Sequence, residues 1–135
     1  MERMTKIIEF VNQAMNEIDV LENNISKGQL LTKFEKEIWL IYKNCESAIF
    51  LLKLEMASID IPDDTKVNID KDHLEYSLPK VNKYIIDSNN LITSAKFVEA
   101  LLKLRLARNI MAEIYTQIKK RNIAEKRRKT KELGV

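Results

Sequence analysis

The residue types that most often carry out chemistry are sparse in this sequence. His73 is the only histidine and Cys45 the only cysteine, so the chain has neither the histidines of a multi-histidine zinc site nor the second thiol of a disulfide. Several aspartates lie between residues 60 and 72, but their order lacks the turn glycine and the closing glutamate of a calcium loop. We therefore expect no metal and no cofactor.

The surroundings of these two residues do not indicate catalysis. Cys45 falls in the middle of an apolar helical stripe, which is typical of a buried thiol in a reducing compartment. His73 lies among charged neighbours, where a solvated side chain is expected. The chain has only two glycines, too few for a glycine-rich phosphate loop, and no serine-centred elbow. We expect a protein that is not an enzyme and has no small-molecule substrate.

The strongest chemical signal is a cluster of cations at the C-terminus. Residues 119–135, here called the basic tail, carry eight Lys or Arg and two Glu, a net charge of +6 within a chain of net charge +3. Residues 1–118 therefore sum to −3, and such asymmetry points to a polyanionic partner. We predict that the basic tail binds the nucleic-acid backbone, of DNA or RNA. The predicted contacts are Lys119, Lys120, Arg121, Lys126, Arg127, Arg128, Lys129 and Lys131.

Two alternatives to this prediction stay open. Lysine and arginine favour helix C-termini, so the tail could be merely solvated. A basic patch could instead form on residues 1–118, from Lys33, Lys36, Lys43, Lys80 and Lys83.

The basic tail continues a long predicted helix that begins near residue 94 and contains neither Gly nor Pro up to residue 132. Its predicted core face is formed by Phe97, Leu101, Leu104, Met111, Tyr115 and Ile118. A second row, at spacings of four, makes the apolar surface too wide for a single neighbouring helix. This row and an off-stripe tryptophan predict a partner interface, formed by Val98, Leu102, Leu106, Ile110 and Trp39. The alternative function is therefore a protein–protein interaction or scaffold subunit, acting as a homo-oligomer with a solvated tail.

Three further helices precede the long one. Apolar spacing of three and four predicts helices over about residues 2–22 and 32–57, and a third over about 71–88. Pro79 indicates either a kink in the third helix or the start of a second segment. We predict an all-α fold, an antiparallel up-and-down four-helix bundle of residues 1–118 with a kinked third helix. The connection at residues 58–70 is long enough to cross one end of the bundle.

The apolar residues are also arranged as in a cytoplasmic protein. The first residues lack the apolar block of a signal peptide, and the longest apolar run covers only residues 48–52, far too short for a membrane span. The basic tail lacks the apolar face that an interfacial membrane helix needs. We expect a soluble cytoplasmic chain with no membrane partner.

One family resemblance adds to this interpretation. A helix containing residues 43–55, an acidic loop, the residues Asp-His-Leu-Glu at 72–75 and a final Ala- and Leu-rich helix resemble HEPN domains, the four-helix bundles of prokaryotic toxin and nucleotide-binding systems. Ribonucleases of that family need an Arg followed five positions later by His. Here Arg105 is followed by Ile110, and Arg108 by Glu113. The resemblance therefore implies an inactive or accessory RNA-associated bundle.

Overall fold

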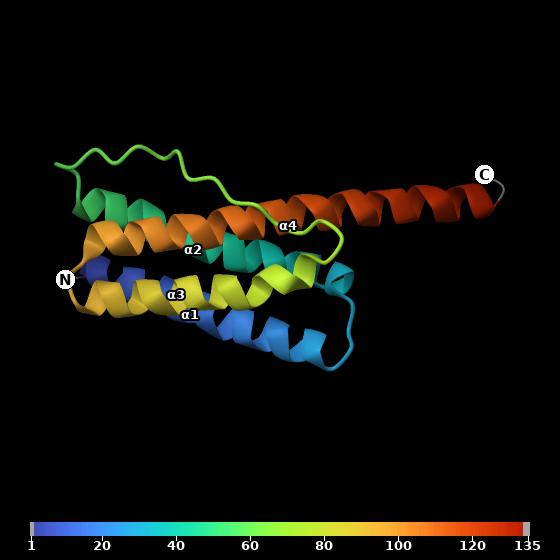
Figure 1. Cartoon of the computed structure of the whole chain (residues 1–135), viewed down its shortest axis with the longest axis horizontal. Helices are drawn as coiled ribbons and strands as arrows, with labels where there is room; N and C mark the ends of the chain where they lie inside the picture. The colour runs from blue at the N-terminus through green and yellow to red at the C-terminus, as the bar shows by residue number, and fades with distance from the viewer. Residues whose placement is uncertain (1, 134–135) are drawn as a thin grey trace.

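The computed structural model describes residues 2–133, and within that range it contains helices and connections but no strand. The predicted all-α class is confirmed. Four α-helices form the molecule (Figure 1): α1 (Glu2–Ser26), α2 (Glu35–Glu55), α3 (Leu78–Thr93) and α4 (Phe97–Glu132). Two short 3₁₀ segments, Leu31–Phe34 and Leu74–Ser77, precede α2 and α3.

The helices bury the apolar stripes that the spacing predicts. Ile7, Val11 and Ile18 of α1 are fully buried, as are Leu104 and Met111 of α4. Side chains that repeat at three and four positions share one face of a helix, and burying that face against neighbours supplies most of the stability of a bundle.

The four helices form a square in which every neighbouring pair runs in opposite directions. α1 packs against α2 and α3, and α4 packs against the same two helices. In Figure 1, α1 and α4 run from left to right, whereas α2 and α3 run from right to left. Helices α2 and α3, which are consecutive in the sequence, are therefore parallel, and their connection must return along the whole bundle.

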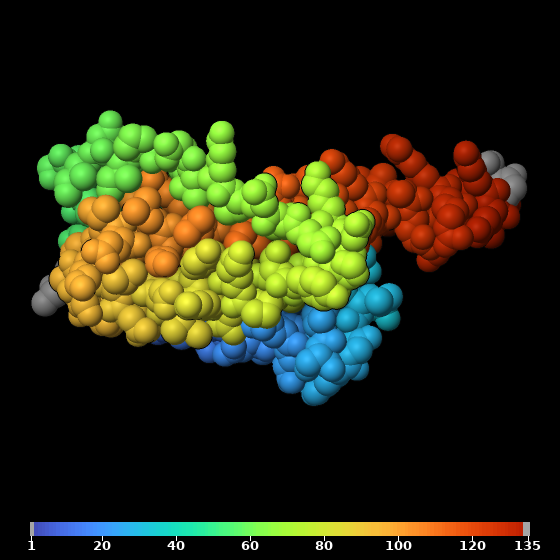
Figure 2. All heavy atoms as spheres, in the orientation of Figure 1, coloured from blue at the N-terminus to red at the C-terminus, as the bar shows by residue number. Residues whose placement is uncertain are grey.

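That connection, residues 56–73, is here called the crossover segment. It runs along α4 rather than crossing one end of the bundle. The predicted up-and-down order was therefore wrong, because it needs α2 and α3 to be antiparallel. Near its start the Ile61 carbonyl accepts a hydrogen bond from Arg105, and near its end the Lys71 carbonyl accepts one from Arg121. Figure 2 shows this segment lying over α4.

The predicted third helix consists of two pieces. The 3₁₀ segment Leu74–Ser77 is followed by α3, which begins at Leu78 and has Pro79 in its first turn. A proline at this position loses no intrahelical hydrogen bond, because the first N–H groups of a helix have no partner within it. Pro79 therefore marks the start of a helix, which is one of the two interpretations of the sequence, and does not kink a longer one.

Candidate nucleic-acid interface

The basic tail continues α4 beyond the end of the bundle. Ile118 is the last buried residue of α4, and between Lys119 and Leu133 only Asn122 is even partly buried. Figures 1 and 2 show the resulting rod, which projects away from the other three helices. At 1.5 Å per residue, residues 119–133 are about 22 Å long.

The base of the rod is held by the first turn of α2. Lys119 Nζ lies 3.3 Å from the Tyr115 hydroxyl and 3.9 Å from a Glu35 carboxylate oxygen. Asn122 Nδ2 donates to Glu35 Oε1 at 3.1 Å and to the Thr32 carbonyl at 3.2 Å. The hydrogen bond to Tyr115 raises the pKa of Lys119, which therefore stays charged at neutral pH. These contacts fix the direction in which the tail leaves the bundle.

One predicted cation, Arg128, is neutralised within the tail. Its guanidinium lies 2.6 Å from Glu125 Oε1 and 3.0 Å from Glu132 Oε1. The hydrogen bond between Arg128 and Glu125 lowers the pKa of Glu125 and raises that of Arg128, so both groups are charged at neutral pH. Spacings of three and four residues place the three side chains on one side of the helix.

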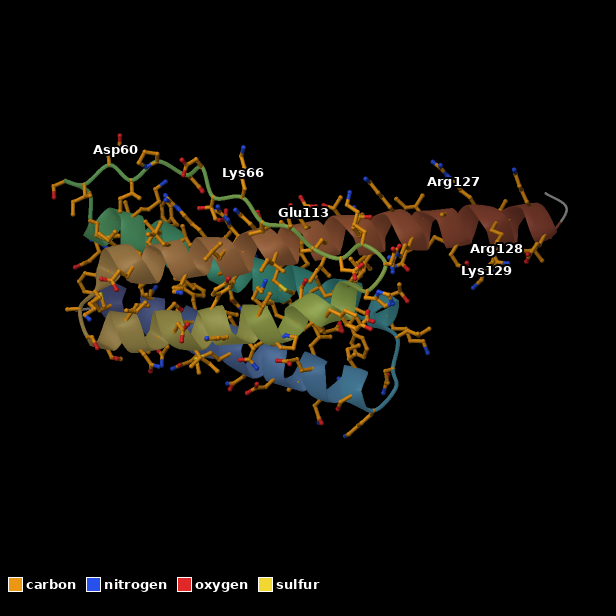
Figure 3. All side chains as sticks on the ribbon, viewed as in Figure 1. Asp60, Lys66, Glu113, Arg127, Arg128 and Lys129 are labelled. Atoms are coloured by element: carbon orange, nitrogen blue, oxygen red, sulfur yellow. The ribbon has the colours of Figure 1, made fainter. Side chains whose placement is uncertain are left out.

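Five other cations of the tail are available to a partner. Their side chains make no hydrogen bond and no ion pair with any residue in the described range: Lys120, Lys126, Arg127, Lys129 and Lys131. All five are exposed. In Figure 3, Arg127 and Lys129 leave the helix on opposite sides. Of the eight predicted contacts, therefore, five are unpaired, and Lys119, Arg121 and Arg128 are engaged within the chain.

The predicted partner interface is only partly at the surface. Val98 and Leu102 are exposed and Leu106 is half-buried, but Ile110 is 2% exposed and belongs to the core. A row of residues at spacings of four turns about 40° with each step, so Ile110 lies about 120° around α4 from Val98. Including Ile110 in an exposed row was wrong for this reason.

Trp39 is exposed near the start of α2, with Lys43 Nζ 5.0 Å from the centre of its ring. The start of α2 packs beside Lys119 of α4, whereas Val98 lies in the first turn of α4. Trp39 is therefore near one end of the bundle and Val98 near the other, and the two do not form one surface.

A polar cluster that was not predicted from the sequence holds the crossover segment against α4. The Arg105 side chain is 1% exposed and donates to the carbonyls of Ile61 and Pro62, both at 3.1 Å. Arg108 bridges Glu46 of α2 and Asp63 of the crossover segment, with both N–O distances 2.8 Å. The sequence could have indicated this cluster, because Arg105 and Arg108 lie within the packed part of the last helix and the connection before it is acidic.

The pKa of Asp63 is lowered, chiefly by the hydrogen bond from Arg108. The ionised Asp63 carboxylate therefore stabilises the folded state. This stabilisation is fully present above the pKa of the unfolded chain, about 4, and is lost as pH falls through the lower pKa of the folded state. We expect Asp63→Asn to destabilise the protein at pH 6 and to differ much less from wild type at pH 3. Urea unfolding at both pH values measures this.

Asp64→Asn is the matched control, because Asp64 is exposed and makes no ion pair with a described residue. Its effect should be small at both pH values. An equal effect of the two substitutions at pH 6 would show that the ion pair of Asp63 does not stabilise the fold.

Cys45 is buried in the core, and His73 makes local contacts near the end of the crossover segment. Burial raises the pKa of Cys45 to about 12, so its thiol is protonated at neutral pH. The His73 ring stacks on Tyr76 with the ring centres 4.6 Å apart, and its Nδ1 lies 3.3 Å from Asp70 Oδ2. Asp70 also accepts from the backbone N–H groups of residues 72 and 73. Within residues 2–133, no group of three or more His, Cys, Asp or Glu side chains is placed to hold a metal ion.

None of the helices formed by the described residues is long and apolar enough to cross a membrane. Comparison of the chain with protein-family models, with curated proteins and with solved structures finds no match.

Proposed function

We propose that this protein is a non-enzymatic helical module that binds the backbone of a nucleic acid through its basic tail, as an accessory part of a larger assembly. The observation that carries the proposal is the projecting end of α4, where five exposed cations have no ion-pair partner among the described residues. If these cations served only to form ion pairs on the surface, each would be expected to lie beside a carboxylate. Here the two glutamates of the tail are both engaged by Arg128.

The shape of the tail also suits backbone contacts. All residues from 123 to 133 are exposed, so a long polyanion can approach this part of the tail from several directions. Lysine and arginine on such a surface contact phosphates and give affinity that depends little on sequence. Nucleic acid is therefore favoured over a compact acidic ligand, which would need a concave site.

The proposal is tested by fluorescence anisotropy with labelled DNA and RNA, single- and double-stranded, at low salt. A tail variant removes four cations that have no ion pair with a described residue: Lys126→Gln, Arg127→Gln, Lys129→Gln and Lys131→Gln. A body variant makes the same change in net charge on the bundle: Lys33→Gln, Lys36→Gln, Lys80→Gln and Lys83→Gln.

We expect the tail variant to lose at least about tenfold in affinity and the body variant to lose much less. Both sets are exposed and lack ion pairs with described residues, so both variants should fold, and circular dichroism checks this. Equal losses would mean that affinity follows overall charge and not the tail, and a larger loss for the body variant would place binding on the body. If no probe binds the wild-type protein, the proposal is wrong.

A second candidate function, a homo-oligomeric scaffold, is favoured by one observation. Leu102 is 42% exposed and, with Leu91 and Leu106, lines an open hollow of about 560 Å³ between α3 and α4. Exposed apolar surface of this kind is often covered by another chain. The mass of the protein in solution, measured on the same samples over a range of concentrations, tests this candidate.

A further inference from the structure

Charge is distributed unevenly around the basic tail. Successive residues of an α-helix are about 100° apart, so Glu125, Arg128 and Glu132 fall within one sector of about 60°. Arg128 pairs with both glutamates, at 2.6 and 3.0 Å, so these three residues carry a net charge of −1. Both glutamates of the tail lie there, and no other acidic residue occurs in residues 119–135.

The unpaired cations lie on two flanks outside this sector. Lys120, Arg127 and Lys131 are within about 40° of one another on the first flank, and Lys126 and Lys129 occupy the second. Figure 3 shows Arg127 and Lys129 projecting to opposite sides of the helix. The tail therefore has two cationic flanks, about 150° apart across the face opposite the Glu125–Arg128–Glu132 sector.

The face between the two flanks carries small and apolar groups. Ile123 is exposed there, and Thr130 lies about two helical turns further along. The Thr130 hydroxyl donates to the Lys126 carbonyl at 3.0 Å, so its hydrogen-bonding capacity is largely used within the helix. The face has no carboxylate, since both glutamates of residues 119–135 lie in the opposite sector.

We propose that the basic tail lies in the major groove of double-helical DNA, with its two cationic flanks against the two backbones and its Glu125–Arg128–Glu132 sector outward. This inference rests on the proposed function. The major groove of B-form DNA is about 12 Å wide and admits an α-helix, whereas that of double-stranded RNA is too narrow. Proteins that bind single strands stack bases on aromatic side chains, and residues 119–135 contain no aromatic residue.

The first test measures the affinity of the full chain for three probes at one salt concentration: a 20-base-pair DNA duplex, an RNA duplex of the same sequence and one DNA strand. We expect the affinity for the DNA duplex to be at least about tenfold higher than that for either other probe. Equal or tighter binding of RNA or of the single strand would overturn the groove assignment but leave nucleic-acid binding intact. If none of the probes binds, the proposed function fails and this inference fails with it.

The second test compares two substitutions that each lower the net charge by one. Thr130→Glu puts a carboxylate between the flanks, facing the groove, whereas Arg128→Gln changes the outward sector. We expect Thr130→Glu to weaken binding of the DNA duplex about tenfold and Arg128→Gln to weaken it only about twofold. Both keep good helix formers in the tail. Equal losses, or a larger loss for Arg128→Gln, would contradict the proposed orientation.

Discussion

Replacing Arg105 with alanine is expected to lower the free energy of unfolding by about 3 kcal/mol. The guanidinium is buried between α4 and the crossover segment, and it holds the Ile61 and Pro62 carbonyls at 3.1 Å. Alanine would remove both hydrogen bonds and leave a cavity where the side chain packs. Two losses at one buried site add up to more than a typical surface substitution costs.

Urea denaturation followed by circular dichroism measures this change. Arg3→Ala is the matched control, because Arg3 also pairs with a carboxylate, Glu55 at 3.1 Å, but is about half exposed. Exposed ion pairs contribute about 1 kcal/mol or less. Arg105→Lys should also destabilise, since an ammonium group cannot reproduce the planar two-carbonyl geometry. If Arg105→Ala costs no more than Arg3→Ala, the crossover segment is not held by Arg105.

The helices were predictable because their apolar stripes are long and regular. The row from Phe97 to Ile118 predicted a core face. Its residues at 101, 104, 111 and 118 are buried, and Phe97 and Tyr115 are partly buried against the core. Scarcity of Gly and Pro allowed the last helix to be predicted as one uninterrupted element, and α4 does continue to Glu132. Local spacing and propensity decide these features, so they can be inferred without knowing the neighbours.

The order of the helices around the bundle could not be inferred in the same way. An up-and-down arrangement and the observed one can bury the same apolar stripes. They differ in whether the connection at residues 56–73 crosses an end of the bundle or runs along the packed part of α4. The deciding interactions are long-range, between Arg105, Arg108 and the crossover segment. A buried arginine is stable only when partners reach it, and the sequence does not say which carbonyls will be near.

The sequence predicted which cations the candidate interface contains, but not which of them bind other groups of the chain. The eight cations could be read from the sequence, whereas their division into paired and unpaired groups depends on the structure. Arg121 binds the Lys71 carbonyl, fifty positions away in the chain. Helical spacing alone could have indicated two sets of partners: the glutamates three and four residues from Arg128, and Tyr115, four residues from Lys119.

Affinity of this protein for duplex DNA is expected to fall about 500-fold between 50 and 200 mM salt. Each phosphate neutralised by a protein cation releases condensed counterions, so the logarithm of the affinity falls with the logarithm of salt by about 0.9 per contact. The five cations without ion pairs among the described residues would then give a slope of about −4.5. Arg128, already neutralised by two glutamates, should add little.

The slope can be divided among the residues that produce it. Removing one cationic flank with Lys126→Gln and Lys129→Gln should reduce its magnitude by about 1.8, because two contacts are lost. Lys80→Gln with Lys83→Gln changes the net charge equally on α3 and should leave the slope near that of wild type. Anisotropy titrations at four salt concentrations measure all three proteins. A slope that changes equally in the two variants would mean that affinity follows overall charge and that the projecting helix makes no distinct set of phosphate contacts.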